Sequence, residues 1–273
     1  MKRDLVSCND VQLEYITYGD GKEHVLCMHG HGRQAEDFKF VAKEDRKVIS
    51  INLFHHGNSI FPLERIEKNP ITTSEVIQLM QLIIKKENLI NFHCIAFSQG
   101  GRFILALLPH FQKQILSISL LSPDGLDNYS FYNWASRRKW ARKLFISWEK
   151  EPNKLRKFSD VAVRLMLMRP KVRDFVYKFT NDHKTLQRAS QSWRSFRLIM
   201  SKPKQTGLII LENNIPFVII MGKYDKIIRP IQALRYAKKS GLINCVIQIE
   251  CGHDFFKKEN IDLFKPNLLI QID

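Results

Sequence analysis

Short apolar runs separated by helix-like stretches constrain the fold of this 273-residue chain more than any other feature of its sequence. Each run has four to seven residues and is apolar at most positions, as strands buried on both faces of a parallel sheet require. The runs occupy residues 25–28, 48–53, 92–97, 115–121, 216–221 and 245–249. Because helical patterns lie between them, we predict an α/β fold, with a mostly parallel twisted sheet and helices on both faces.

The segments between the runs carry the start signals and periodicity of helices. Thr72 and Glu75 have the spacing of a capping box and precede an apolar stripe. Further helices are predicted over residues 102–111 and 231–240. Residues 6–18 instead alternate between apolar and polar positions, which predicts antiparallel strands at the edge of the sheet.

Residues 125–205 are chemically unlike the rest of the chain. They hold 20 Lys and Arg residues against 6 Asp and Glu residues, whereas the remainder holds 23 against 21. Helical spacing predicts three or four helices there, one of them beginning at Ser159 and Asp160. One apolar stripe comprises Trp134, Ala141, Leu144, Phe145 and Trp148, with Lys139, Arg142, Lys143 and Lys150 opposite. We therefore expect one domain from residues 1–124 and 206–273 and a helical insertion over residues 125–205.

A serine lies in a tight turn between a predicted strand and a predicted helix. Ser98 has Ala96 two residues before it and Gly100 two residues after it, and such a sharp turn needs small residues at both places. The turn is typical of a serine nucleophile at the carboxyl end of a strand, with Ala96 in place of the first glycine of the usual motif.

An acid and a histidine follow Ser98 in the order that such a nucleophile requires. Asp225 comes after the run at 216–221, and His253 after the run at 245–249. Loops at the carboxyl ends of parallel strands meet at one edge of the sheet. Asp124, which follows the run at 115–121, is a second candidate for the carboxylate.

With these motifs the sequence resembles the α/β-hydrolase superfamily over residues 11–124 and 205–256. The resemblance includes the His29-Gly30 turn and the loop from His56 to Ser59. It implies Ser98 as nucleophile, His253 as general base and then acid, and Asp225 as the carboxylate that orients the imidazole. It also implies an oxyanion hole formed by the backbone amides of His31 and Gln99.

The resemblance also narrows the reaction. A serine nucleophile excludes epoxide opening and halide displacement, which relatives perform with an aspartate. It leaves attack on a carbonyl: esters first, then thioesters, amides or the carbon–carbon bonds of diketones. Two positions depart from the family pattern: Asn52 replaces the usual Asp, and His55 replaces a common glycine. We expect His29, His31, His55 and His56 to be structural loop residues.

The resemblance implies that residues 125–205 form a cap. Their positive charge attracts anions, so the expected partner is a small acyl substrate, either neutral or anionic such as an acyl-coenzyme A thioester. Docking on anionic lipid is a second explanation of Trp with Lys and Arg on helices. A third explanation is that the excess of Lys reflects a biased proteome. Nucleic-acid binding and a non-catalytic hydrolase fold are the rivals from other classes, and no nucleic-acid motif is present.

Cysteine usage and hydropathy bear on metals and location. The five cysteines have no paired spacing, so we expect no disulfides and a reducing cytoplasm. Cys251 and His253 lack a second ligand pair, and we expect no metal and no cofactor. No apolar run reaches the ~18 residues of a membrane span, and no signal-peptide pattern follows the first charged residues.

Overall fold

The computed structural model describes residues 1–126 and 136–271, with the backbone alone at residues 175 and 178, and the chain forms two compact units. Unit 1 comprises Met1–Pro62, Ile71–Asn128 and Leu198–Asp273, and unit 2 comprises Leu63–Pro70 and Tyr129–Arg197. Unit 2 therefore includes most of the basic insertion together with a short earlier segment. Its role as a cap remains a prediction.

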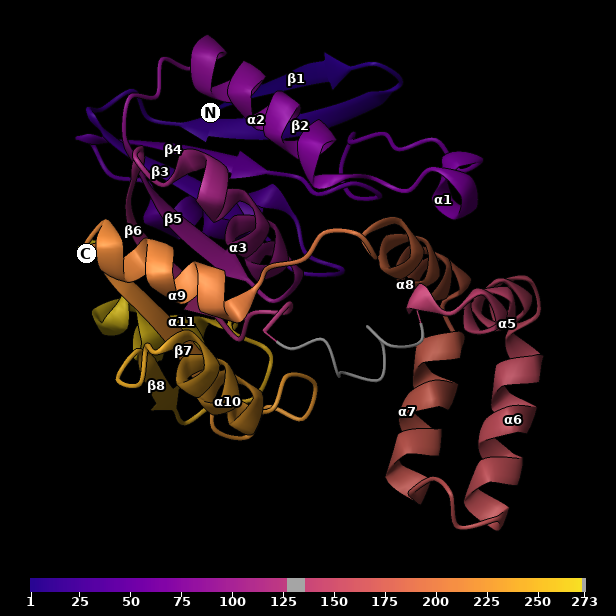
Figure 1. Ribbon diagram of the computed structural model, residues 1–273. Coiled ribbons are helices and arrows are strands. Elements are labelled where there is room, and N and C mark those ends of the chain that lie inside the picture. Colours follow the sequence, from indigo (N-terminus) through magenta and orange to yellow (C-terminus); the bar gives the residue numbers. More distant parts are fainter. Residues whose placement is uncertain (127–135, 272–273) are drawn as a thin grey trace. The chain divides into compact units, whose positions relative to one another are not determined.

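Unit 1 is built on an eight-stranded sheet in the order β1-β2-β4-β3-β5-β6-β7-β8 (Figure 1). Its strands are β1 Lys2–Cys8, β2 Val11–Tyr18, β3 Glu23–Met28, β4 Arg46–Ile51, β5 Phe92–Phe97, β6 Ile115–Leu121, β7 Phe217–Gly222 and β8 Val246–Ile249. β2 pairs antiparallel with both β1 and β4, and the pairs from β4 through β8 are parallel. The predicted fold class is confirmed.

Helices cover both faces of this sheet. On one face, Phe38 of η1 (Ala35–Val41) and Phe264 of α11 (Lys258–Phe264) are buried against Val25, Ile95 and Ile220 of the strands. On the other face (Figure 1), α3 (Gln99–Phe111) packs against β3, β5 and β6, and α10 (Pro230–Ser240) packs against β7 and β8. Because both faces are covered there, the central strands β5, β6 and β7 are apolar at most positions.

The remaining helices of unit 1 follow from local signals. α2 (Thr73–Lys86) has the predicted capping box: the Thr72 hydroxyl accepts the Glu75 amide at 3.2 Å, and the Glu75 carboxylate accepts the Thr72 amide at 3.0 Å. α9 (Pro203–Glu212) begins with a proline, which lacks the amide that the first turn would leave unpaired. The short η2 (Lys265–Asn267) follows α11.

Unit 2 is helical in the residues described. Its helices are α1 Arg65–Lys68, α5 Lys139–Lys150, α6 Pro152–Arg164, α7 Pro170–Thr180 and α8 His183–Ser195. The apolar stripe of α5 contributes buried Ala141 and Phe145, which pack with Trp148 and Trp193; Trp134 lies outside the described residues. The predicted helix start at Ser159 is wrong, because α6 begins at Pro152 and the Ser159 hydroxyl donates to the Arg156 carbonyl inside the helix.

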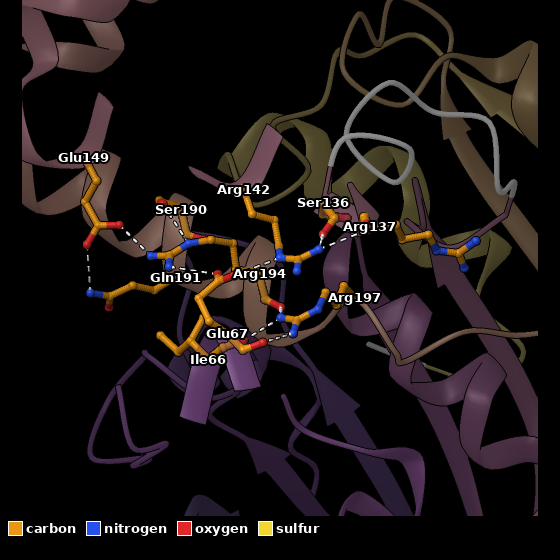
Figure 2. Close-up of polar contacts among 10 residues, drawn as sticks. All are labelled: Ile66, Glu67, Ser136, Arg137, Arg142, Glu149, Ser190, Gln191, Arg194 and Arg197. Carbon is orange, nitrogen blue, oxygen red and sulfur yellow. Dashed lines mark hydrogen bonds and ion pairs between the residues drawn. The ribbon is translucent and has the colours of Figure 1, made fainter. Parts of the chain in front are cut away.

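A network of arginines and glutamates joins α1 to α5 and α8 (Figure 2). The Glu67 carboxylate accepts Arg142 Nε at 2.9 Å and Arg194 Nη1 at 3.2 Å. The Arg197 guanidinium donates to the carbonyls of Ile66 and Glu67, at 2.5 and 2.7 Å. Burial alone would raise the pKa of Glu67, but the hydrogen bonds from the two arginines hold it below its ordinary value. Arg142, predicted on the face opposite the apolar stripe, thus binds another residue of the same unit.

Candidate active site

The turn between β5 and α3 holds Ser98 in a strained conformation. Ser98 has φ 47° and ψ −115°, a region that residues other than glycine seldom adopt and that costs about 1–3 kcal/mol. The backbone around it is fixed, because the Ser98 amide donates to the Leu121 carbonyl at 2.9 Å and the Ser98 carbonyl accepts the Asp124 amide at 2.7 Å. A side chain on Gly100 would collide with the Met28 carbonyl. The turn therefore needs glycine there and keeps the serine at the end of the strand.

His253 connects Ser98 to Asp225. Its Nε2 lies 3.0 Å from the Ser98 hydroxyl, and its Nδ1 lies 2.6 Å from Oδ2 of Asp225. A carboxylate only accepts hydrogen bonds, so Nδ1 carries the proton and Nε2 accepts the serine hydroxyl. The Phe97 ring, with its centroid 5.0 Å from that of the imidazole, packs on His253. The structure thus brings together three residues that the sequence places far apart.

The Asp225 side chain is fully buried and is held by the backbone that follows it. Its Oδ1 accepts the amides of Ile227 and Ile228 at 2.8 and 2.9 Å, which leaves Oδ2 for His253. These amides fix the carboxylate before any substrate arrives, and a fixed carboxylate fixes both the tautomer and the orientation of the ring.

Asp124, the second candidate for this carboxylate, has a different partner. Its Oδ2 lies 3.0 Å from Arg102 Nε and 2.9 Å from Arg102 Nη2, and its Oδ1 accepts the Gly125 amide at 2.7 Å. Arg102 is 1% exposed and also donates to the Ile199 carbonyl. This buried pair lies beneath the turn that carries Ser98, while Asp225 is the carboxylate on His253.

The loop after β3 approaches Ser98 closely. A Cβ on Gly30 would lie 2.8 Å from the Ser98 Cβ, so only glycine fits there. His31 follows Gly30 in this loop, and Gln99, which is 3% exposed, is the first residue of α3. The His31 ring meets the His56 ring edge to face, with centroids 5.7 Å apart.

Two histidines hold this loop through their ring nitrogens. His29 Nε2 accepts the Leu53 amide at 3.1 Å, and His56 Nε2 accepts the Gly32 amide at 3.0 Å. Each ring therefore carries its proton on Nδ1, from which His29 donates to the Gly30 carbonyl at 2.7 Å and His56 to the Phe54 carbonyl at 3.0 Å. Complete burial, followed by the nearby His56, holds the pKa of His29 well below its ordinary value. These contacts agree with the predicted structural role of the two histidines.

Sequence reasoning did not identify Glu14, a buried carboxylate of β2 that ties two loops near the site. It accepts the Asn52 side chain at 2.6 Å and both the amide and the side chain of Asn58, at 2.9 and 2.7 Å. Asn52 in turn accepts the Ala35 amide at 2.8 Å. Burial alone would raise the pKa of Glu14, but these hydrogen bonds hold it below its ordinary value. A glutamate between apolar residues of a predicted strand was the available signal.

The described residues offer no group of three or more His, Cys, Asp or Glu side chains that could hold a metal ion. All five cysteines are free, and four of them are buried. Within the same part of the chain, no helix combines the length and the apolarity needed to cross a membrane.

The chain matches the model of the α/β-hydrolase fold family over residues 23–259, and it belongs to this family. No curated protein matches it. An esterase from Thermogutta terrifontis with malate bound is similar in structure, at 14% identity and a TM-score of 0.63, over 96% of this chain and 95% of that one. A membrane phospholipase A described as a bacterial virulence factor has the same identity and TM-score, over 96% and 83%. The thioesterase domain of the curacin biosynthetic pathway is 15% identical with a TM-score of 0.62, over 96% and 97%. At such identities the likeness establishes the fold alone.

Proposed function

We propose that the protein is a serine hydrolase that cleaves esters through an acyl-enzyme on Ser98. The observation that carries this proposal is the unbroken chain of hydrogen bonds from the Ser98 hydroxyl through His253 to Asp225. A serine alone is a weak nucleophile, and a histidine placed to take its proton, itself oriented by a carboxylate, supplies the activation.

In the first half of the proposed reaction, Ser98 Oγ attacks the carbonyl carbon while His253 Nε2 takes the hydroxyl proton. The carbonyl oxygen becomes an oxyanion, which the backbone amides of His31 and Gln99 stabilise; one such donor is typically worth about 10²–10³ in rate. His253 then donates the proton to the leaving alcohol as the bond to carbon breaks. Water repeats the sequence on the acyl-enzyme, and its proton passes through His253 to Ser98 as the acid leaves.

Replacing Ser98 with alanine tests the proposal. We expect Ser98→Ala to abolish turnover of short p-nitrophenyl esters and covalent labelling by a fluorophosphonate, without change in the far-UV circular dichroism spectrum. Ser122→Ala is the matched control, because Ser122 also follows a strand directly and is buried, and its hydroxyl accepts the Gly222 amide at a long 3.3 Å. Full activity of Ser98→Ala, or a label mapped to another residue, would refute the nucleophile. A wild-type protein that neither turns over esters nor takes the label would instead favour the non-catalytic hydrolase fold.

The charge of residues 125–205 favours a second candidate, hydrolysis of anionic thioesters of the acyl-coenzyme A type. These residues include 20 basic and 6 acidic side chains, and this imbalance creates a field that concentrates anions. In this proposal these residues also serve as the cap that the family resemblance implies. Paired neutral and anionic acyl substrates distinguish the candidates: steering predicts a higher kcat/KM for the anion at low salt and a loss of that preference at high salt.

A further inference from the structure

The turn between α6 and α7 exposes apolar side chains that a folded protein usually buries. Leu165, Met166 and Leu167 are 60%, 95% and 80% exposed, and we call these three residues the hairpin tip. Val161 and Val172, on the last turn of α6 and the first turn of α7, are 56% and 45% exposed. Scattered exposed apolar residues are ordinary, but five within one turn and its two flanking helices mark an interaction surface.

The hairpin is held firmly by polar contacts in its stem, away from the tip. The Tyr177 hydroxyl donates to the Asp160 carboxylate at 2.7 Å and links the two helices. The Arg156 guanidinium donates to the Thr180 hydroxyl and to the Asn181 side chain, both at 2.8 Å, at the other end of α7. These contacts join α6 to α7 and to the residues after it, so the hairpin does not depend on the tip side chains to hold its two helices together.

The tip itself is a defined turn. The amides of Leu167 and Met168 both donate to the Ala162 carbonyl, at 2.8 and 3.1 Å. Met166 has φ 57°, in the left-handed region where a residue other than glycine is strained. The turn keeps this strained conformation while a methionine and two leucines face solvent. We therefore expect it to hold these side chains in place for a partner.

Basic residues flank the hairpin tip in the sequence. Residues 152–180, which span α6 and α7, contain eight Lys and Arg residues and two Asp residues. Arg164, Arg169 and Lys171 lie next to the tip in sequence and are exposed. We call these three residues the basic collar. An apolar tip beside a basic collar matches an anionic bilayer, because the apolar side chains can enter the acyl boundary while the cations bind headgroup phosphates. Long basic side chains can reach outward to the headgroups as the tip inserts.

We propose that the hairpin tip docks the protein on the surface of an anionic phospholipid bilayer. Two other occupants fit the observations less well. A second copy of the chain would bring basic collars together, which repel. Single-stranded nucleic acid would match the charge, but sites of that kind use aromatic side chains on which bases stack, and the tip has none.

Flotation of the full chain with vesicles tests the proposal. We expect binding to vesicles of phosphatidylcholine mixed with phosphatidylglycerol and little binding to phosphatidylcholine alone. The variant L165S/M166S/L167S should lose roughly tenfold or more in partitioning, because it removes the inserted apolar surface. The variant R164E/R169E/K171E should lose more, since each basic residue near an anionic surface contributes about fivefold. High salt should also reduce the binding of the wild-type protein to the anionic vesicles.

Matched variants on unit 1 control for hydrophobicity and charge. Ile90, Leu208 and Ile243 are 77%, 58% and 74% exposed, and the variant I90S/L208S/I243S should partition like the wild-type protein. Lys204, Lys238 and Lys258 are also exposed, and K204E/K238E/K258E should lose far less than the collar variant. Equal losses in tip and control variants would overturn the proposal, as would undiminished binding of the tip variant or equal binding to neutral vesicles.

A fluorescent reporter tests where contact occurs. In a Cys8→Ser background the other native cysteines are buried, so Met166→Cys accepts an environment-sensitive nitrobenzoxadiazole label. Its emission should shift to the blue on adding anionic vesicles, whereas a label at Ile243→Cys should not respond. A label at residue 166 that is already shifted without lipid, with a sedimentation coefficient that rises with protein concentration, would identify a second copy as the occupant and overturn the proposal.

Discussion

The loops around Ser98 and the turn between α6 and α7 differ in the burial and hydrogen bonding of their side chains. Ser98, His253 and Asp225 have specific partners: His253 lies between Ser98 and Asp225, and backbone amides occupy the second oxygen of Asp225. In the hairpin tip, Met166 and Leu167 are 95% and 80% exposed. Both regions contain a residue other than glycine at positive φ, Ser98 in one and Met166 in the other.

The comparison separates two ways in which strain serves a function. At Ser98 the strained residue is enclosed by hydrogen bonds and buried neighbours, as expected where atoms must be placed accurately for chemistry. At Met166 the strained residue is surrounded by solvent. No reacting atoms have to be positioned there, and the turn only has to expose an apolar surface. Substitutions in the first region should therefore alter rate or stability, and substitutions in the second should alter association alone.

The largest expected effect is at the carboxylate that orients His253. Asp225→Asn keeps the size of the side chain but presents an amide that can also donate to the imidazole, and this stabilises the wrong tautomer. By analogy with the same substitution in serine proteases, kcat should fall by about 10⁴. Ester turnover at saturating substrate measures the loss, and the thermal midpoint checks that the fold remains. A decrease of less than tenfold would mean that the tautomer is set by another group.

A smaller effect is expected at the carboxylate that ties the loops. Asn52→Asp would place a second carboxylate beside Glu14, whose oxygen now accepts the Asn52 side chain at 2.6 Å. Two carboxylates in one buried site cannot both be ionised without cost, and we expect a loss of about 1–3 kcal/mol in the free energy of unfolding at neutral pH. This is also why the asparagine suits this chain where the family has an aspartate.

The pH dependence of that variant has a definite sign. In the wild-type protein the pKa of Glu14 is below its ordinary value, so its contribution is present above the unfolded pKa and is lost as the pH falls through the folded pKa. In Asn52→Asp one carboxyl pKa is raised, so the deficit should shrink as acid protonates the pair. Urea unfolding at neutral and mildly acidic pH measures both trends. A deficit that stays constant with pH would indicate a packing defect and not charge repulsion.

The sheet and the order of the candidate site residues could be predicted because they depend on local patterns. Apolar runs of strand length mark strands buried on both faces, and Asp225 and His253 each follow such a run. The choice between Asp225 and Asp124 could not be made in this way, because both follow a strand. It depends on Arg102, a residue of α3 whose buried guanidinium binds Asp124, and sequence patterns do not reveal such long-range pairing.

Unit 2 was predictable in its helical content and in the stripe of Ala141, Phe145 and Trp148, since helical spacing alone indicates a shared face. The partners of its charged side chains could not be predicted. Arg142 lies opposite that stripe and binds Glu67 of the short helix α1, a contact that helical spacing cannot indicate. The exposed tip escaped prediction because an apolar residue in a turn carries no periodicity from which its burial can be judged.

The smallest expected effect compares one substitution in the two regions. Leu167→Ser should change the free energy of unfolding by no more than about 0.5 kcal/mol, because an 80% exposed side chain contributes little in water. Leu120→Ser, in β6 and fully buried, is the control and should cost about 3–5 kcal/mol from lost burial and a buried hydroxyl. Chemical unfolding without lipid measures both. A large loss at Leu167 would show that the tip packs within the molecule, and the contrast between the two regions would then have to be abandoned.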